Sequence, residues 1–124
     1  MAETLYDQVG GQAFFEKLVE GFYDAVSHDE ILRPMYPEDL TESKRTLVLF
    51  LCQYWGGPTT YMDERGHPRL RMRHAPFRIT KKARDAWMAA MTSALSIVRS
   101  ELTQDQFDEM TAYFDMAAHQ MRNV

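Results

Sequence analysis

The sequence predicts an all-α fold. Apolar residues recur at spacings of three and four along most of the chain, helix start and stop signals separate these segments, and no useful length alternates with period two. The chain has 124 residues, of which 45% are hydrophobic, and this suits one domain with one core. We therefore expect a single domain over residues 1–124.

The N-terminal half is expected to contain a long helix and, later in the sequence, a second helix. Residues 14–26 carry the apolar stripe of an amphipathic helix, and a short helical piece at 5–9 precedes them. Asp29 can cap a further short turn. The second helix is expected over residues 41–55, because glycine in Gly56-Gly57-Pro58 accepts a left-handed conformation and proline cannot continue a helix.

The C-terminal half is expected to begin with an irregular segment. Residues 58–79 should form a loop with one or two short helical turns, and His74 should lie at the end of such a turn. Long loops inside compact domains tend to be functional. Thr80 is a plausible N-cap for a helix that runs to about Val98. "TQDQ" at 103–106 is a capping box that starts the last helix.

The composition predicts a cytoplasmic protein. Cys52 is the single cysteine, which excludes an internal disulfide and fits a reducing compartment. No charged segment followed by a long apolar stretch opens the chain. The longest apolar run, "LVLFLC" at 47–52, is far shorter than the roughly 18 residues of a membrane span. We expect no membrane span.

Positive charge is concentrated in one stretch, although the net charge is -4. Residues 65–84 contain no Asp or Glu but carry eight cations: Arg65, Arg69, Arg71, Arg73, Arg78, Lys81, Lys82 and Arg84. This segregation favours an anionic partner. The acidic remainder of the chain would repel nucleic acid and favours a small anionic ligand. A solvated loop whose arginines pair with acidic helix faces is the alternative.

His74 is a candidate metal ligand. Pro76 restricts the preceding residue to extended conformations, so the turn should end just past His74. A free carbonyl at a helix end can accept the Nδ1–H of an imidazole and leave its Nε2 lone pair for a metal. No further ligands stand at familiar zinc spacing. The alternative is an ordinary surface histidine.

Polar-tipped aromatic residues complete the set of candidates. Tyr23, Tyr36 and Trp87 each need a partner for an O–H or N–H group when buried, although most such residues are plain core. One cofactor would unite these features with His74 and the arginines. Haem is flat and largely apolar, its iron accepts an axial histidine, and its propionates pair with arginine.

Long stretches of the chain resemble the truncated haemoglobins, specifically group II. The resemblance rests on "FYDAV" at 22–26, "RPMYPEDL" at 33–40, "LFLCQYWGGPTTY" at 49–61, "RGHPRLRMRHAPFRI" at 65–79 and "DAWMAAM" at 85–91. It implies a truncated globin-like two-over-two helical sandwich that encloses one haem b per chain. It also implies that His74 is the proximal iron ligand.

The resemblance implies further site residues. The residues around the cofactor would be His74, Arg73, Tyr23, Tyr36, Leu47, Phe50, Leu51, Tyr61, Leu70, Phe77, Trp87 and Met91. On the distal side, ligand would meet Tyr23, Tyr36, Trp87, Ser43 and Leu47. Hydroxyl and indole donors stabilise the negative charge that bound O₂ acquires, and this slows its release.

The leading functional hypothesis is reversible binding of O₂, CO or NO, with oxygen transport or storage as the role. A second hypothesis is an enzyme that uses the same haem, either an NO dioxygenase or a peroxidase. It would need an external reductase, because the chain has no flavin or nicotinamide motif. A third is a cofactor-free helical interaction module with a basic loop. The sequence does not define an oligomeric state.

Overall fold

Helices form the regular structure of this protein, as the sequence predicts. The structure is a computed structural model and describes residues 3–124. In chain order the elements are α1 (Leu5–Gln8), α2 (Gln12–Ser27), the 3-10 helix η1 (Arg33–Met35), α3 (Thr41–Tyr54), α4 (Thr60–Arg65), α5 (Leu70–His74), α6 (Lys81–Ile97), the 3-10 helix η2 (Arg99–Glu101) and α7 (Gln104–Met121). The described residues contain no strand.

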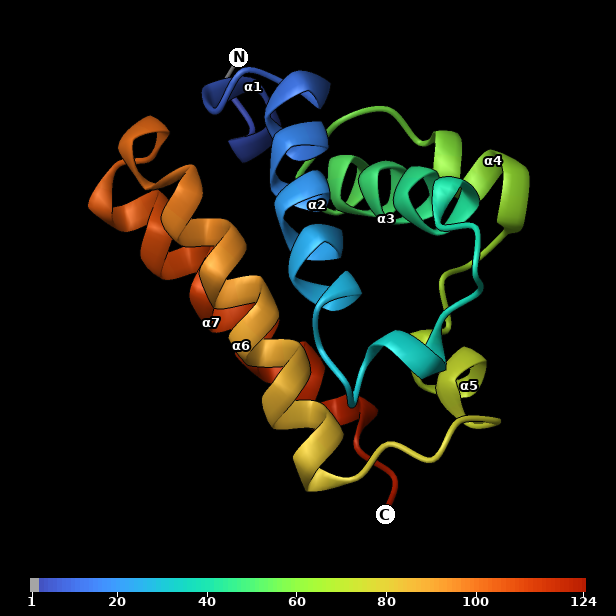
Figure 1. Ribbon diagram of the computed structural model, residues 1–124. Coiled ribbons are helices and arrows are strands. Elements are labelled where there is room, and N and C mark those ends of the chain that lie inside the picture. Colours follow the sequence, from blue (N-terminus) through green and yellow to red (C-terminus); the bar gives the residue numbers. More distant parts are fainter. Residues whose placement is uncertain (1–2) are drawn as a thin grey trace.

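The long helices are arranged as two pairs. Helix α2 packs against α3, and α6 packs against α7. The closest association between the pairs is that of α2 with α6, which joins them into one body. Figure 1 shows α6 and α7 side by side, with α2 between them and α3. This is the two-over-two arrangement that the resemblance implies, and the fold prediction is confirmed.

Local sequence signals explain where the long helices begin and end. The Thr80 hydroxyl accepts a hydrogen bond from the Ala83 N–H at 3.1 Å and so caps α6. Thr103 and Gln106 form the expected capping box at the start of α7. Shortly after the end of α3, Gly56 has a φ of 94°. Glycine adopts this left-handed conformation without strain, because it has no Cβ atom.

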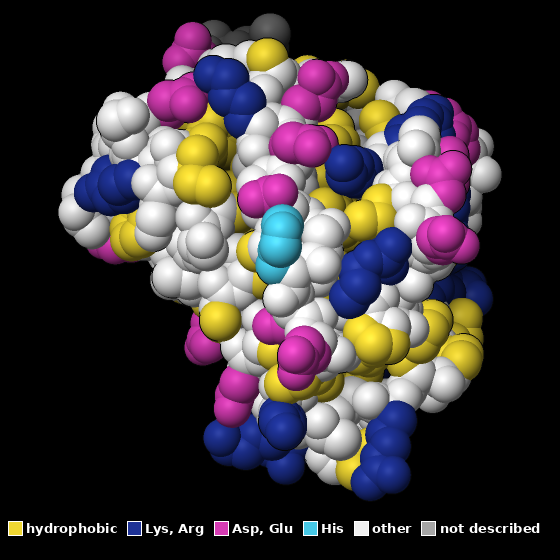
Figure 2. Space-filling view, in the orientation of Figure 1, with side chains coloured by type: hydrophobic (Ala, Val, Ile, Leu, Met, Phe, Trp, Pro, Cys, Tyr) yellow, Lys and Arg dark blue, Asp and Glu magenta, His cyan; other side chains and the backbone are white. Residues whose placement is uncertain are grey.

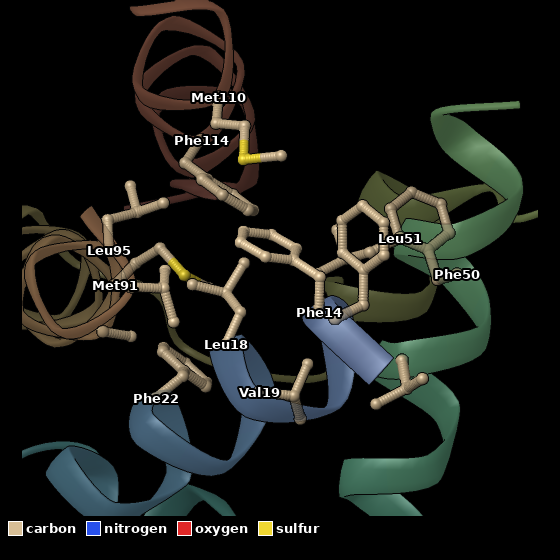
Figure 3. Close-up of a cluster of buried hydrophobic side chains, with 14 of the residues drawn as sticks. Phe14, Leu18, Val19, Phe22, Phe50, Leu51, Met91, Leu95, Met110 and Phe114 are labelled. Carbon is tan, nitrogen blue, oxygen red and sulfur yellow. The ribbon is translucent and has the colours of Figure 1, made fainter. Parts of the chain in front are cut away.

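The core lies where the two pairs meet. Each long helix contributes large apolar side chains to it (Figure 3): Phe14, Leu18, Val19 and Phe22 from α2, Phe50 and Leu51 from α3, Met91 and Leu95 from α6, and Met110 and Phe114 from α7. Full burial of one such side chain is worth about 1.5–3 kcal/mol. Within residues 3–124 the buried side chains are all aliphatic, aromatic or sulfur-containing, and Tyr23 and Tyr61 are the buried residues that carry a hydroxyl.

The irregular segment contains two short helices, α4 and α5, as the sequence predicts. His74 is the last residue of α5. A helix of five residues is marginal on its own, so its place must come from tertiary contacts. Helix α5 packs against α7, and Leu70 at its start packs against the core.

Candidate functional site

His74 presents its ring in the way that the sequence predicts. Its Nδ1 lies 2.6 Å from the Leu70 carbonyl oxygen, one turn earlier in α5. A carbonyl only accepts, so Nδ1 carries the proton and donates it. The Nε2 lone pair is then free, and within residues 3–124 Nε2 makes no hydrogen bond. The side chain is half-buried, and this leaves Nε2 accessible to a group that fits against α5.

Tyr23, Tyr36 and Trp87 come together from different elements and form what we call the distal cluster. Tyr23 lies in α2, Tyr36 directly follows η1, and Trp87 lies in α6. The Tyr23 and Tyr36 rings meet edge to face with centroids 5.5 Å apart. The centroid of the Phe22 ring lies 5.0 Å from that of Tyr23 and 5.3 Å from that of Trp87. Phe22 therefore joins the cluster to the core.

The tyrosines of the distal cluster are held in the neutral form. Burial raises the pKa of Tyr36 to about 12, although a hydrogen bond with Trp87 partly offsets the shift. The pKa of Tyr23 is also raised, first by burial and then by the neighbouring Tyr36. A neutral phenol keeps its O–H, so both residues are hydrogen-bond donors around neutral pH.

The Tyr23 hydroxyl has only a weak partner in the protein. It donates to the Ser43 backbone carbonyl at 3.5 Å, the outer limit for a hydrogen bond. Tyr23 can therefore exchange this bond at small cost for a stronger one to a ligand. Ser43 lies in the first turn of α3, and Leu47 follows one turn later with its side chain half-buried. The structure thus brings these predicted residues to the same part of the molecule as Tyr23.

The remaining predicted cofactor residues differ in exposure. Phe50 and Tyr61 pack edge to face with ring centroids 5.5 Å apart, which fixes α4 against α3. Leu51 and Met91 are fully buried in the core. By contrast, the Phe77 side chain is 46% exposed and lines a surface depression with Arg71 and Arg78.

Arg73 is engaged with the backbone of its own segment. Its guanidinium donates to the carbonyl oxygens of Pro68 at 2.6 Å, Arg65 at 2.8 Å and His67 at 3.4 Å. These bonds tie α5 to the end of α4. The same guanidinium retains N–H groups that are not used within the described chain, because a guanidinium has five donors.

The other cations of the basic stretch are largely unpaired. Lys81 and Arg84 both pair with Asp85 in their own helix. Within residues 3–124, five cations of the stretch make no side-chain hydrogen bond or ion pair: Arg65, Arg69, Arg71, Arg78 and Lys82. The Arg65 guanidinium lies over the Tyr61 ring, 5.9 Å from its centroid. Figure 2 shows Lys and Arg side chains at the lower end of the molecule, where α6 begins. Pairing with acidic helix faces therefore does not account for this charge.

Sequence reasoning missed several residues near the site. Half-buried apolar side chains also pack against the core beside the predicted ones: Met35, Leu40, Ala86 and Met88. Met35 precedes Tyr36, and Ala86 and Met88 flank Trp87, so proximity in sequence could have found them. Asn123 was missed as well. It hydrogen-bonds to the segment that follows His74, and no local pattern marks it.

His74 has no companions that would complete a metal site made only of side chains. Within residues 3–124, no three His, Cys, Asp or Glu side chains lie close enough together to hold a metal ion. A metal at His74 would need its other ligands from a cofactor.

None of the helices in the described part of the chain has both the length and the apolar character needed to span a bilayer.

Two helix pairs, a histidine on a short helix and a cluster of polar-tipped aromatics define a class of protein, the two-over-two globins. Comparison with known proteins agrees with this class. Residues 4–123 match the family model described as "Bacterial-like globin". The chain is 45% identical over 91 residues to group 2 truncated hemoglobin YjbI of Bacillus subtilis, covering 73% of this chain and 69% of that protein.

Solved structures agree in both fold and length. The hemoglobin of Chloroflexus aurantiacus superposes with a TM-score of 0.94 at 46% identity, covering 99% of this chain and 100% of that one. The group II truncated hemoglobin of Bacillus anthracis gives a TM-score of 0.94 at 37% identity, covering 100% and 94%. The chain belongs to the bacterial-like globin family. The resemblance to group II truncated haemoglobins is confirmed, and membership implies haem and small ligands such as O₂.

Proposed function

We propose that this globin holds one haem b per chain through His74 and reversibly binds O₂, CO and NO. The observation that carries the proposal is the bond of 2.6 Å between His74 Nδ1 and the Leu70 carbonyl oxygen. This bond fixes the tautomer and the orientation of the ring. A hydrogen bond donated by Nδ1 also raises the basicity of Nε2, the nitrogen that would bind the iron. Haem would supply an iron that binds diatomic ligands.

The residues around His74 and the distal cluster fit such a group. Half-buried apolar side chains come from η1, α3 and the residue before it, α5 and α6, and they pack against the core while keeping part of their surface free: Met35, Leu40, Leu47, Leu70, Ala86, Trp87 and Met88. A flat apolar cofactor gains about 25 cal/mol for each Å² of apolar surface that it covers. This surface supports haem in preference to a small polar anion.

The distal cluster would retain a ligand by hydrogen bonding. The Tyr23 hydroxyl is held only weakly by Ser43, and burial keeps the Tyr36 hydroxyl protonated. Each donor would stabilise negative charge on the outer atom of O₂ by about 0.5–1.5 kcal/mol, and by more as that charge grows. Several such bonds favour tight binding and slow release, so storage suits this site better than rapid transport.

Cations of the basic stretch would hold the two propionates. Arg73 has unused N–H groups, and its other bonds orient it firmly. Arg69 and Arg71 flank Leu70 at the start of α5, and their guanidinium groups make no hydrogen bond or ion pair within residues 3–124. Arginine is suited to this task, because its fork matches a carboxylate with two parallel hydrogen bonds. We also propose a cytoplasmic location, since the chain has a single, free cysteine, Cys52, and therefore no internal disulfide.

Titration of the purified apoprotein with hemin tests the iron ligand. His74→Ala should abolish stable hemin binding, which is followed by the Soret absorption band. His28→Ala is the matched control, because His28 Nδ1 also contacts the carbonyl one turn earlier, Asp24 at 2.8 Å, but the side chain is exposed. His67→Ala is a second control from the basic stretch. Equal hemin retention in all three variants would refute the assignment.

A further inference from the structure

Asn123, near the C-terminus, is bonded to the segment that follows His74. Its Oδ1 accepts a hydrogen bond from the Ile79 N–H at 2.9 Å. Its Nδ2 donates to the carbonyl oxygens of Phe77 at 2.8 Å and His74 at 3.5 Å. The Asn123 main-chain N–H donates to the Ile79 carbonyl oxygen at 3.0 Å. One residue thus binds this segment from 74 to 79 through both its side chain and its backbone.

Two of these bonds, to the Phe77 carbonyl oxygen and from the Ile79 N–H, satisfy groups that make no hydrogen bond within the segment itself. The last carbonyls of a helix have no partner within the helix, and α5 ends at His74. Pro76 has no N–H to offer, and the Phe77 N–H is the local donor to the His74 carbonyl, at 3.0 Å. The side-chain amide of Asn123 is suited to the role, because it offers donors and an acceptor together.

The N-terminal side of α5 is held by other groups. Arg73 binds the loop carbonyls before α5, and Leu70 packs against the core. On the C-terminal side, Ile79 is buried and anchors the chain five residues beyond His74. Between these anchors, the Asn123 side chain holds the turn after α5 by its bond of 2.8 Å to the Phe77 carbonyl oxygen, and it makes a weaker contact, at 3.5 Å, with the His74 carbonyl oxygen.

We propose that Asn123 is a positioning residue for the iron ligand, and that it sets the depth and tilt of the His74 ring by fixing the end of α5. The proposal rests on the proposed function, because it requires His74 to bind the haem iron. Asn123, which follows α7, would thus help to place His74, although the two residues are far apart in the sequence.

The test uses Asn123→Ala, which removes the whole side-chain contact, and Asn123→Asp, which keeps the acceptor but places a carboxylate against two carbonyl oxygens. Arg122→Ala is the matched control, because the Arg122 side chain donates only to the Val124 carbonyl oxygen. In the apoprotein, hydrogen exchange of the Ile79 amide should become faster in Asn123→Ala and stay unchanged in Arg122→Ala.

In the hemin-loaded protein, Asn123→Ala should release hemin to an excess of an apoglobin acceptor about three to ten times faster than the wild type. Asn123→Asp should release it at least as fast. The iron–histidine stretching band in the resonance Raman spectrum of the ferrous protein should shift in both variants. Circular dichroism should show the same helix content throughout, which separates positioning from unfolding.

Two results would overturn the proposal. If Asn123→Ala speeds Ile79 exchange but leaves hemin release and the Raman band unchanged, Asn123 braces the chain end without positioning the ligand. If His74→Ala retains hemin as well as the wild type, the iron-ligand assignment itself fails, and this proposal fails with it. The first result leaves the proposed function standing, so the two failures are distinguishable.

Discussion

At the scale of single residues, the candidate site is defined by polar atoms that the protein's own hydrogen bonds leave free or only weakly bonded. His74 uses Nδ1 on Leu70 and keeps Nε2 free, whereas His28 makes the same kind of contact on an exposed surface. Tyr23 donates to Ser43 at 3.5 Å, a bond that is easily exchanged. His74 and Tyr23, whose polar atoms are free or weakly used, are both candidates that the sequence marked.

Removal of single distal donors should speed O₂ release. Trp87→Phe and Tyr23→Phe each delete one donor and keep an aromatic ring. We expect the O₂ dissociation rate to rise about two- to tenfold in each, and further in the double variant, because one net hydrogen bond is worth about 0.5–1.5 kcal/mol. Stopped-flow mixing of the oxy form with CO measures this rate.

Tyr113→Phe is the control for these variants. Tyr113 packs with Tyr54 and Trp55, away from the distal cluster, and has its hydroxyl removed in the same way. Its dissociation rate should equal that of the wild type. Unchanged rates in Trp87→Phe and Tyr23→Phe would rule out the role of the distal cluster.

The raised pKa of Tyr36 makes stability depend on alkaline pH. In the unfolded chain this phenol ionises with a pKa near 10.0, but in the folded protein the pKa is about 12, chiefly through burial. Below pH 10.0 both states are protonated, and the stability is fully present. As pH rises from 10.0 toward 12, the unfolded state loses a proton that the folded state keeps, so the free energy of unfolding falls.

Urea unfolding of the apoprotein at a series of alkaline pH values checks this dependence. The wild type should lose stability across that window, and Tyr36→Phe should lose less, because the group that ionises has been removed. Tyr23 and Tyr113, whose pKa values are also raised, account for the remaining loss. An identical loss in wild type and Tyr36→Phe would contradict the burial of this hydroxyl.

At the scale of elements, local signals predicted the long helices well. Thr80 and Thr103 mark the starts of α6 and α7, because each cap is a bond between neighbours in sequence. The extents of α4 and α5 could not be predicted, because short helices show no period. Arg69 at the start of α5 has a φ of 43°, a left-handed conformation that no local sequence signal indicates.

The cap of α7 should contribute measurably to stability. The Thr103 hydroxyl accepts from the Gln106 N–H at 3.2 Å, and the Gln106 side chain accepts from the Thr103 N–H at 2.9 Å. Thr103→Ala should lower the free energy of unfolding by about 0.5–2 kcal/mol. Thr92→Ala, at an exposed position inside α6, should not, because alanine is the better helix former. A smaller loss for Thr103→Ala than for Thr92→Ala would contradict the capping role.

At the scale of the whole molecule, the core and the site are one packed structure. Phe22 contacts both Tyr23 and Trp87, and Phe114 on α7 lies 6.0 Å from Trp87. The sequence predicted the members of the distal cluster through resemblance to a family. It could not predict Asn123, whose contact exists only because the end of α7 meets the segment after α5.

The tertiary structure also determines which cations form ion pairs. Lys17, Lys44 and Arg45 all pair with glutamates from other parts of the chain, whereas most cations of the basic stretch do not. Under the proposed function, these unpaired side chains are available to the anionic edge of the cofactor. The chain thus combines a core of hydrophobic and aromatic side chains with one segment whose positive charge is largely unpaired.

The most direct test of the central claim is the resonance Raman spectrum of the ferrous, ligand-free protein prepared with ¹⁵N-labelled histidine. If His74 Nε2 binds the haem iron, an isotope-sensitive iron–histidine stretching band appears in the wild type and in His67→Ala. It disappears in His74→Gly and returns, without isotope sensitivity to the protein label, when imidazole is added. A labelled band that persists in His74→Gly would contradict the assignment, because another histidine would then hold the iron.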